Sequence, residues 1–485
     1  MAFVPWILLL EECSPRQAFR IGYLIGLIFF GGTVWWIGHV TVPGAILLPA
    51  ALALYFAAWS WVANRGLRDL ETERLRDSAA RGSFSLSVFR SFGPVVTLPA
   101  AWTALEYLRS HLLTGFGWNL LAHTQWNWIE VIQLAGFTGV WGVSFLVVLV
   151  NVALCSVVSR ESCVLRERVV RLAGVGAVMI TVLVYGNQRL GLYSRPTTQD
   201  PRLSFKIALL QGNIPQPEKW DGSFQEAIWK RYEELMAEAV KEKPALIVWP
   251  ETAVPGTLED PAIEDRLKEI SLSAGAEMLV GLPTEDLESR LPYNSALLLG
   301  RDGEERARYS KIHLVPFGEF IPIKPLFGWL KKFYPVADFA PGKEWTVFPT
   351  TPPVSVLVCF EDVFPEMARR FVREGAGWLL VITNDAWFGR SAASLQHLQA
   401  SVFRAVENGV WLGRAANTGW TGFVDPAGRR LPSPGQIPRF KPGVAVTEMP
   451  VLSRPGTFYT RWGDWFPILC LAAACLAFLP SRRRI

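Results

Sequence analysis

Uncharged stretches alternate with arginine-rich segments through residues 1–191. A helix needs about 20 apolar residues to cross a bilayer. The stretches that reach or approach this length are 21–40, 42–63, 94–111, 141–158, 170–188 and, near the C-terminus, 465–480. The pattern predicts six membrane-spanning helices, of which 94–111 is the weakest because Glu106 and Arg109 interrupt it.

The basic residues indicate how these helices are oriented, since Lys and Arg concentrate on the cytoplasmic side of a membrane. Segments 64–93 and 159–171 hold six and four arginines, and three more precede Ile485. In contrast, segment 114–140 has no Lys or Arg but has three tryptophans, a residue type that favours the membrane–water interface. This alternation places the polar segment 192–460 outside the cytoplasm.

Residues 192–460 follow a different pattern, in which short apolar runs alternate with helical patterns. The expected strands are 205–210, 245–249, 277–282, 295–299, 354–358 and 378–383, and the expected helices are 223–242, 261–274 and 394–409. Such alternation predicts an α/β domain in which helices cover a sheet. The expected domains are a helical membrane bundle (1–191), this α/β domain (192–460), and a last transmembrane helix with a basic tail (461–485).

Composition agrees with a membrane protein, because half of the 485 residues are hydrophobic and the mean hydropathy is +0.23. The net charge of +5 is mild, and we expect no nucleic-acid partner. The six cysteines include no C-x-x-C pair and no Cys/His cluster, so we expect no metal site and no cofactor.

The first candidate for chemistry is a cysteine at the end of an apolar strand. In PVSVLVCFEDVFPE, Cys359 follows the expected strand, and acidic residues come directly after it. Taken alone, such a cysteine is more often a small buried hydrophobe than a nucleophile. Other strand ends add polar residues, because WPET supplies Glu251 and KIHLVPFGEF supplies Lys311 and Glu319.

Glutamate, lysine and cysteine together are sufficient for acyl transfer without histidine. A neighbouring ammonium favours the thiolate, a carboxylate can accept the thiol proton and return it to a leaving group, and a lysine can stabilise the oxyanion that forms when a carbonyl is attacked. Each residue also has a simpler interpretation. Glu251 could cap a helix, and Lys311 could be a solvated surface charge.

Other polar side chains have competing interpretations as well. His313 or His397 could form a dyad with the cysteine, but an additional histidine is more often a hydrogen-bonded structural residue. Asn384 and Asp385, in VITNDAWFG, could shape the site or form an Asx-turn.

The ordered motifs WPET, KIHLVPFGEF, VCFEDVFPE and ITNDAWFG resemble the nitrilase superfamily, with its Glu-Lys-Cys triad. The stretches LLQGNIPQPEKW and VPFGEFIP, with the flanking membrane spans, narrow the resemblance to the apolipoprotein N-acyltransferase family over nearly the whole chain. The resemblance implies a nitrilase-like α-β-β-α sandwich inserted in a multi-span transmembrane bundle. It also implies a bacterial inner (plasma) membrane protein whose catalytic domain faces the periplasm or the cell exterior.

The resemblance further implies an activity. Cys359 would take an acyl chain from a phospholipid donor as a thioester and pass it to the α-amine of a diacylglyceryl-modified apolipoprotein. By the motif match, Glu251 is the general base, Lys311 the oxyanion stabiliser and Cys359 the nucleophile. Supporting or substrate-binding positions fall on Trp220, Glu319, Phe360, Glu361, Asn384 and Trp387.

The sequence departs from the family pattern at two points. Phe360 stands where the family has Tyr, so the ring is kept and its hydroxyl is lost. Six spans are expected where eight are usual, and the N-terminus lacks the usual first hairpin. The smaller number of spans indicates a truncated N-terminus, a misassigned start or a smaller bundle.

Alternative functions use the same residues differently. A membrane-tethered carbon-nitrogen hydrolase (an amidase or nitrilase) would use the triad with water as the acceptor, and an inactive nitrilase-like binding module would not need all three residues. A transporter is disfavoured because the spans lack paired charges. Segment 320–335 mixes large apolar side chains with three lysines, as interfacial segments do, and so favours the transferase, which needs access to lipid.

Overall fold

The computed structural model describes residues 2–79, 93–158, 165–193, 204–285, 290–332, 338–450 and 456–478. The chain forms two compact units. One consists of Met1–Leu190 with Trp462–Ile485, and the other of Gly191–Arg461. The start of the expected α/β domain at 192 and the basic tail lie mostly outside the described residues.

The second unit is built on two sheets. The first has the order β11 (Gly443–Pro450), β1 (Ser204–Gln211), β2 (Leu246–Val248), β3 (Glu277–Glu285), β4 (Pro292–Leu299) and β5 (Glu305–Ser310). The second has the order β10 (Gln436–Ile437), β9 (Thr421–Val424), β8 (Trp411–Ala416), β7 (Trp378–Thr383) and β6 (Val354–Val358). Strands β1, β2 and β3 run parallel, as do β6, β7 and β8, and the other pairs are antiparallel.

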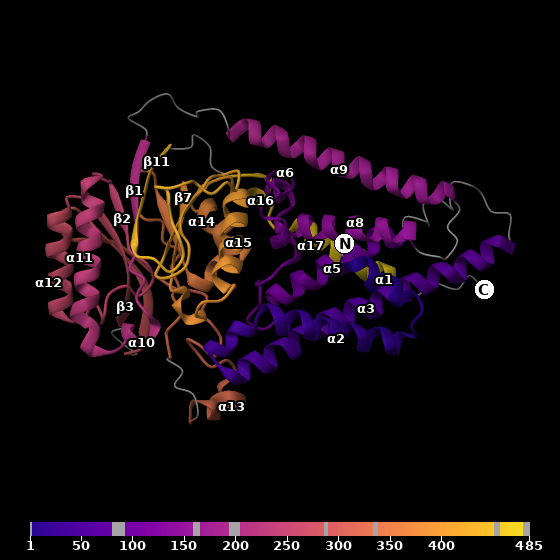
Figure 1. The fold of residues 1–485 in the computed structure, drawn as a ribbon, viewed down its shortest axis with the longest axis horizontal. Coiled ribbons are helices and arrows are strands. Elements are labelled where there is room, and N and C mark those ends of the chain that lie inside the picture. The colour runs from indigo at the N-terminus through magenta and orange to yellow at the C-terminus, as the bar shows by residue number, and fades with distance from the viewer. Residues whose placement is uncertain are drawn as a thin grey trace. The chain divides into compact units, whose positions relative to one another are not determined.

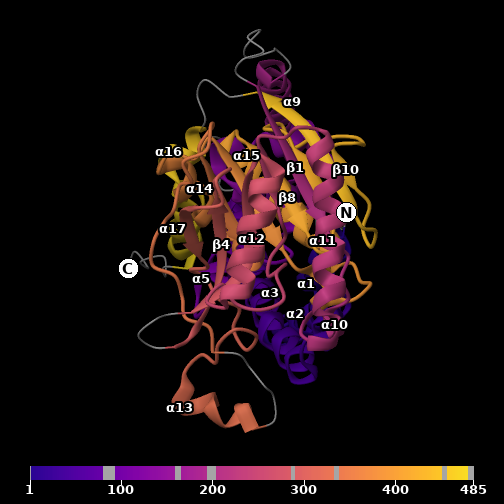
Figure 2. The ribbon, with the colours of Figure 1, turned by 90° about the vertical axis from the view of Figure 1, so that its left-hand side faces the viewer.

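Helices cover the outer faces of both sheets, which gives four layers (Figure 1). Helices α11 (Gln225–Lys241) and α12 (Pro261–Ala274) lie on the first sheet, in front of it in Figure 2. Helices α14 (Pro365–Arg373) and α15 (Ala393–Asn408) lie on the second. Helix α11 buries Trp229, Tyr232 and Leu235 on its apolar face, and Asp260 caps the N-terminus of α12. The α-β-β-α sandwich predicted from the sequence is confirmed.

All six strands and three helices predicted in this unit are present, with ends that differ by a few residues. Strands β5, β8, β9, β10 and β11 and helix α14 were not predicted. The strand ends matter most for the site. Glu251 follows β2, Lys311 follows β5, Cys359 follows β6 and Asn384 follows β7.

The helical unit contains α1 (Phe3–Glu11), α2 (Pro15–Thr33), α3 (Val42–Ala79), α5 (Gly93–His111), α8 (Val140–Val158), α9 (Leu165–Tyr193) and α17 (Trp465–Phe478), and the short helices α6 (Ile129–Ile132) and α7 (Ala135–Thr138) lie between α5 and α8 in the sequence. Helices α2 and α3 approach closely at Gly22, where a Cβ atom would lie 2.2 Å from the Ser60 hydroxyl oxygen. Helix α1 packs through Phe3 and Trp6 against Trp102 of α5.

Each predicted membrane span overlaps one of these helices, but the predicted span 21–40 extends beyond the end of α2 at Thr33 into the 3-10 helix η1 (Trp35–His39). By length and composition, two helices in the described part of the chain qualify as membrane spans, within Val42–Arg68 and Arg168–Tyr193. Three others, including Val140–Cys155 and Trp465–Leu476, are apolar but shorter. The unit is therefore a helical region with two long apolar helices, and the six-span bundle stays a prediction.

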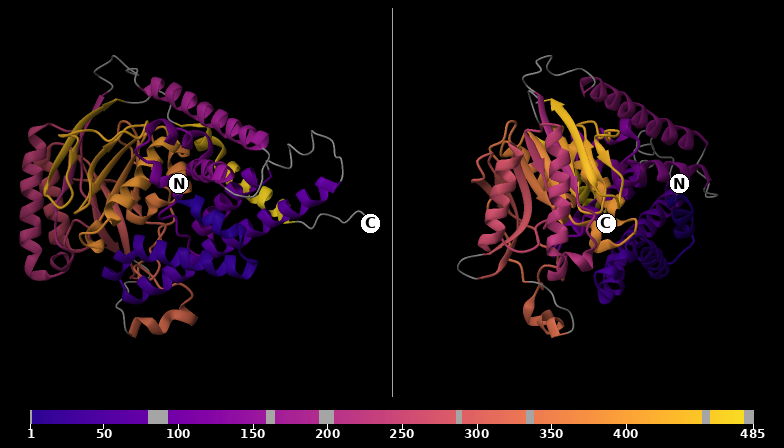
Figure 3. Two further views of the ribbon diagram at one scale, coloured as in Figure 1. Left: turned by 45° about the vertical axis from the view of Figure 1, so that its right-hand side comes forward. Right: turned by 60° about the vertical axis from the view of Figure 1, so that its left-hand side comes forward.

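One segment of the second unit lies apart from the sandwich. It carries α13 (Lys324–Phe327) and η5 (Gly328–Lys332) and extends away from both sheets in the views of Figures 2 and 3. Ile323 and Trp329, each 58% exposed, lie in it.

Candidate active site

Cys359 lies directly after β6, at the first position of the short helix η6 (Cys359–Val363). Its backbone φ angle is +53°, in the left-handed region that residues other than glycine rarely adopt. The side chain is buried, with 8% of its surface exposed. Such a conformation persists only where surrounding contacts hold it. The contacts around this turn therefore identify what positions the thiol.

The buried carboxylate of Glu361 connects this turn to the segment that carries Lys311. Its Oε2 accepts a hydrogen bond from the Val358 backbone N–H at 2.8 Å. Its Oε1 accepts three more, from the backbone N–H groups of Ile312 and His313 and from the Tyr309 hydroxyl. Burial raises the pKa of Glu361 to about 7, although these hydrogen bonds oppose the shift. One side chain thus fixes the end of β6 against residues on both sides of Lys311.

Glu251 lies just past β2 and is also buried. Its Oε1 accepts a hydrogen bond from the Asn294 side-chain amide at 2.7 Å, and its Oε2 accepts one from the Asn384 backbone N–H at 2.7 Å. The Asn294 amide also donates to Glu319 Oε1 at 3.1 Å. Asn294 therefore holds the carboxylates of Glu251 and Glu319 close to one another through its side-chain amide.

Lys311 is almost fully buried and forms an ion pair with Glu319, whose Oε2 lies 2.9 Å from the ammonium nitrogen. Burial disfavours the ammonium, but the negative charges of Glu319, Cys359 and Glu251 outweigh burial and raise the pKa of Lys311. Lys311 therefore stays charged at neutral pH. We call Glu251, Lys311, Glu319 and Lys219, whose ammonium donates to the Glu251 carbonyl oxygen at 2.9 Å, the reaction cluster.

The charges of the reaction cluster are close enough to Cys359 to act on its sulfur. Burial and the Glu251 carboxylate raise the pKa of Cys359 well above its usual value. Lys311 and a hydrogen bond with the Thr383 hydroxyl favour the thiolate but do not outweigh these effects. The resting side chain is therefore a neutral thiol that needs a base, which the adjacent carboxylate can supply.

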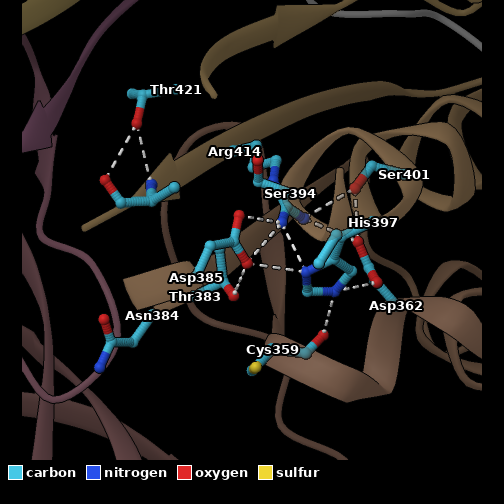
Figure 4. Close-up of polar contacts among 12 residues, drawn as sticks. Cys359, Asp362, Thr383, Asn384, Asp385, Ser394, His397, Ser401, Arg414 and Thr421 are labelled. Atoms are coloured by element: carbon cyan, nitrogen blue, oxygen red, sulfur yellow. Dashed lines mark hydrogen bonds and ion pairs between the residues drawn. The ribbon is translucent and has the colours of Figure 1, made fainter. Parts of the chain in front are cut away.

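A second group of charges lies on the other side of Cys359. We call Asp362, Asp385, His397 and Arg414 the ion network; all four side chains are fully buried (Figure 4). His397 Nε2 lies 2.7 Å from Asp362 Oδ1 and 3.1 Å from the Cys359 carbonyl oxygen. Figure 4 shows the Cys359 sulfur directed away from this ring. His397 therefore supports the turn through its backbone, as the structural interpretation of this histidine expects.

Charge pairing keeps the ion network ionised. Arg414 contacts Asp362 Oδ2 at 2.9 Å and Asp385 Oδ2 at 3.2 Å. Burial opposes the Asp385 carboxylate, but Arg414 and His397 outweigh burial and lower the pKa of Asp385 to about 2. Burial and Arg414 likewise oppose a charge on His397, and the two carboxylates reverse this, so the pKa of His397 is raised.

The remaining predicted site residues surround the strand ends in different ways. Phe360 is buried and its ring contacts Phe364, 5.1 Å between centroids. The Asn384 side chain accepts a hydrogen bond from the Ala386 backbone N–H, as in an Asx-turn, and donates one to Gln216 Oε1. Both interpretations of Asn384 thus hold, because its own backbone N–H binds Glu251. The ring of His313, the other dyad candidate, contacts that of Phe364 in a tilted arrangement, with 4.0 Å between centroids.

Two large aromatic side chains are exposed near the site. Trp220 is 53% exposed and Trp387 is 44% exposed. A cavity of about 320 Å³ is lined by Trp220, Lys219, Asp221, Gln225, Pro255, Gly256, Thr257, Pro283, Pro292 and Phe339. Within the described residues, no three His, Cys, Asp or Glu side chains are arranged to hold a metal ion.

Sequence reasoning missed Lys219, Asn294 and two members of the ion network, Asp362 and Arg414. Lys219 stands next to the predicted Trp220 in the quoted stretch LLQGNIPQPEKW, which is the only signal that could have drawn attention to it. Asn294 and Arg414 lie in strands without any distinguishing pattern. Their roles depend on contacts between distant segments, which a single sequence does not reveal.

Comparisons with known proteins cover both units. Residues 1–153 match the apolipoprotein N-acyltransferase N-terminal domain family, and residues 206–452 match the carbon-nitrogen hydrolase family. Among solved structures, a mutant amidase of the nitrilase superfamily from Nesterenkonia AN1 matches with 25% sequence identity and a TM-score of 0.40. The match covers 53% of this chain and 93% of the amidase.

Full-length relatives extend the match across both units. This chain is 38% identical to the apolipoprotein N-acyltransferase of Geobacter metallireducens, over 100% of this chain and 91% of that protein. It is 33% identical to the apolipoprotein N-acyltransferase of Methylococcus capsulatus, over 98% of this chain and 89% of that protein. The chain therefore belongs to the apolipoprotein N-acyltransferase family, with a carbon-nitrogen hydrolase domain at residues 206–452.

Proposed function

We propose that this protein is an apolipoprotein N-acyltransferase that works through a thioester on Cys359. The acyl chain comes from a phospholipid and passes to the α-amine of a diacylglyceryl-modified N-terminal cysteine. The observation that carries the proposal is full-length similarity to named N-acyltransferases, which includes the helical unit as well as the hydrolase domain. A nitrilase domain alone would not favour a lipid substrate over a soluble amide.

In the first half-reaction, Glu251 takes the proton from the Cys359 thiol as the sulfur attacks the ester carbonyl carbon. The ammonium of Lys311 stabilises the oxyanion that forms on the carbonyl oxygen. The carbon–oxygen ester bond then breaks, and Glu251 returns its proton to the departing alkoxide. The burial of the thiol and the fixed Glu251 carboxylate support these roles, because a neutral thiol next to an oriented base needs a single short proton transfer.

In the second half-reaction, the lipoprotein amine attacks the thioester carbonyl carbon. Glu251 accepts a proton from the attacking nitrogen, Lys311 again stabilises the oxyanion, and the carbon–sulfur bond breaks. The proton on Glu251 then returns to the Cys359 sulfur, which restores the thiol. Glu361 and Glu319 position the turn and the lysine, and Trp220, Phe360, Asn384 and Trp387 shape or line the approach to the sulfur.

The location follows from the same proposal. The protein is associated with a membrane, and we place it in the bacterial inner membrane as a multi-pass protein with Gly191–Arg461 outside the cytoplasm. The arginine-rich segments support this orientation. The exposed Ile323 and Trp329 support contact between the α13 segment and lipid, where phospholipid donors are found.

The decisive experiment is intact-mass analysis of the purified protein after incubation with a phospholipid of defined acyl chains. We expect one acyl adduct, located on Cys359 by fragmentation and removed by neutral hydroxylamine, which cleaves thioesters. The Cys359→Ala variant should carry no adduct. Incubation without any adduct in the wild type would contradict the proposal.

The alternative is a membrane-tethered carbon-nitrogen hydrolase, and the hydrolase domain alone would support it. The second half-reaction separates the two functions. A transferase should convert a diacylglyceryl-cysteine peptide into its N-acylated form, with little free fatty acid released. A hydrolase should release free acid with or without the peptide and leave the peptide amine unmodified.

A further inference from the structure

Lys219 is a buried lysine that the triad does not include. It is the last residue of the short helix α10 (Gln216–Lys219) and is 4% exposed. Its ammonium donates a hydrogen bond to the backbone carbonyl oxygen of Glu251 at 2.9 Å. It also lines the cavity that contains Trp220. Lys219 therefore lies between that cavity and the residue that acts as the base.

The charges in the reaction cluster are unevenly paired. Lys311 and Glu319 form an ion pair and neutralise one another. Glu251 accepts its side-chain hydrogen bonds from amide groups, at Asn294 and Asn384. In the described part of the chain, neither Glu251 nor Lys219 forms an ion pair with another side chain. The site thus holds one unpaired carboxylate and one unpaired amine, close together and buried.

Acyl transfer moves negative charge through this region. When Glu251 takes the thiol proton, the negative charge passes from its carboxylate to the Cys359 sulfur. A buried anion without a counter-ion is costly, and Lys311, which favours the thiolate, also pairs with Glu319. A cation that lies near both Glu251 and Cys359 lowers the free energy of the charged site before and after this proton transfer.

We propose that Lys219 is the second cation of the site, and that its ammonium balances the negative charge which Glu251 and Cys359 exchange during acyl transfer. The assignment rests on the proposed function for the reaction that it serves. Its test uses the thiol alone and needs no acyl donor. Lys219 acts through the electrostatic field at the sulfur and is therefore a positioning residue.

The electrostatics of Lys219 agree with this role. Burial lowers the pKa of Lys219 to about 7, while the negative charges of Glu251 and Cys359 oppose this shift. The ammonium therefore forms near neutral pH and is favoured when negative charge develops on the sulfur. The groups that act on it are Glu251 and Cys359, and Asp221 lines the same cavity.

A purely structural role would be different, because Lys219 could serve only to hold the Glu251 backbone. Two substitutions separate these roles. Lys219→Gln removes the charge and keeps a donor for the Glu251 carbonyl, whereas Lys219→Met removes both. The matched control is Lys206→Met, because Lys206 lies in the same unit and bonds with Glu242 at the surface.

The experiment measures the rate at which iodoacetamide alkylates Cys359 in the full-length protein, as a function of pH. Peptide mass spectrometry must resolve the site, because Cys13 and Cys475 are at least partly exposed. We expect Lys219→Gln and Lys219→Met to slow alkylation about tenfold or more near pH 7.5 and to raise the apparent pKa of the thiol. Lys206→Met should match the wild type.

Several outcomes distinguish the roles. An unchanged rate in Lys219→Gln, with slow alkylation only in Lys219→Met, would make Lys219 structural and overturn the proposal. If Lys219→Met fails to accumulate, Lys219→Gln decides alone. If the wild type forms no acyl adduct but its alkylation still depends on Lys219, the proposed function fails and the role of this lysine stands.

Discussion

Two buried groups of charged side chains lie on either side of Cys359, and they are organised differently. In the ion network, Asp362, Asp385, His397 and Arg414 each contact an oppositely charged partner. In the reaction cluster, only Lys311 and Glu319 do so, and Glu251 is held by neutral amides. The paired group holds the backbone of the cysteine through His397, and Glu251 and Lys311 of the incompletely paired group act more strongly on its thiol than Asp385 of the paired group does. The ion network thus keeps Cys359 in place, and the reaction cluster supplies the groups that make its thiol reactive.

This separation has an energetic reason. A buried charge with a fixed partner resists titration, which suits residues that must keep the left-handed turn at Cys359. A base must instead change its protonation state during each turnover, so a permanent ion pair would hinder it. Substitutions in the ion network should therefore reduce stability, and those in the reaction cluster should reduce rate with little loss of stability.

The largest effect is expected from removing the sulfur itself. Cys359→Ala should abolish both the acyl adduct and transfer, because no nucleophile remains. The thermal unfolding temperature in detergent should stay near that of the wild type, since the network contacts the Cys359 backbone and not its side chain. Transfer at a near-normal rate by this variant would exclude the covalent mechanism.

Next in size is the loss of the base. Glu251→Gln keeps the length of the side chain and one hydrogen-bond acceptor but removes the basic function. We expect acylation and deacylation to slow alike, by roughly 10²–10⁴-fold, the range that general acid–base catalysis supplies. Single-turnover measurements of each half-reaction check this. Slowing of only one half-reaction would show that another group handles the proton in the other.

On the opposite side of the cysteine, Arg414→Met should act on stability. It leaves the Asp362 and Asp385 carboxylates buried without the arginine, and such a loss typically costs about 3–5 kcal/mol. Chemical denaturation of the variant in detergent measures the free energy of unfolding. An unfolding free energy equal to that of the wild type, with transfer strongly slowed, would reverse the division between the two groups.

The ion network also predicts an acid limit for stability. The pKa of Asp385 is lowered from 3.8 to about 2 in the folded protein. A lowered carboxyl pKa contributes stability that is present above about pH 4 and is lost as the pH falls toward 2, by about 2 kcal/mol for this group. His397 contributes in the opposite sense, because its raised pKa stabilises the fold at lower pH. Unfolding temperatures between pH 2 and 5 test the Asp385 contribution.

The sequence predicts the central strands well because they are fully buried, and uninterrupted apolar runs such as Val354–Val358 mark such strands clearly. Their arrangement as a two-sheet sandwich was implied by the family resemblance and not by these runs. Strand β5 was missed because its sequence ERARYS is charged and half exposed. Strand β8 was missed because Arg414 lies within it, and this arginine is buried only because two aspartates from other elements neutralise it.

The candidate site likewise contains residues that can be predicted from the sequence and residues that cannot. Glu251 follows β2 and Cys359 follows β6, which belong to different sheets, and Lys311 follows β5, an antiparallel strand that was not predicted. Their nomination rests on the family resemblance of the motifs that contain them. Lys219 comes from a short helix before α11, and nothing local distinguishes it from a surface lysine. Its burial results from the packing of α10 next to Glu251, which only the structure shows.

The smallest expected effect concerns Lys311 and Glu319, the ion pair of the reaction cluster. Lys311→Met removes the ammonium and leaves Glu319 as an unpaired anion near the sulfur, so the pKa of Cys359 should rise. We expect iodoacetamide to alkylate Cys359 about tenfold more slowly near neutral pH, besides slower acyl transfer. If both rates were unchanged, Lys311 would have no part in the chemistry.

The double variant Lys311→Met with Glu319→Gln sharpens this test. It also removes the Glu319 carboxylate that the single substitution leaves unpaired. Alkylation should therefore recover toward the wild-type rate, while acyl transfer stays slow because no ammonium stabilises the oxyanion. This split between thiol reactivity and transfer would identify Lys311 as an oxyanion stabiliser and leave Lys219 as a further cation that favours the thiolate. Recovery of both rates would instead assign the oxyanion to another donor.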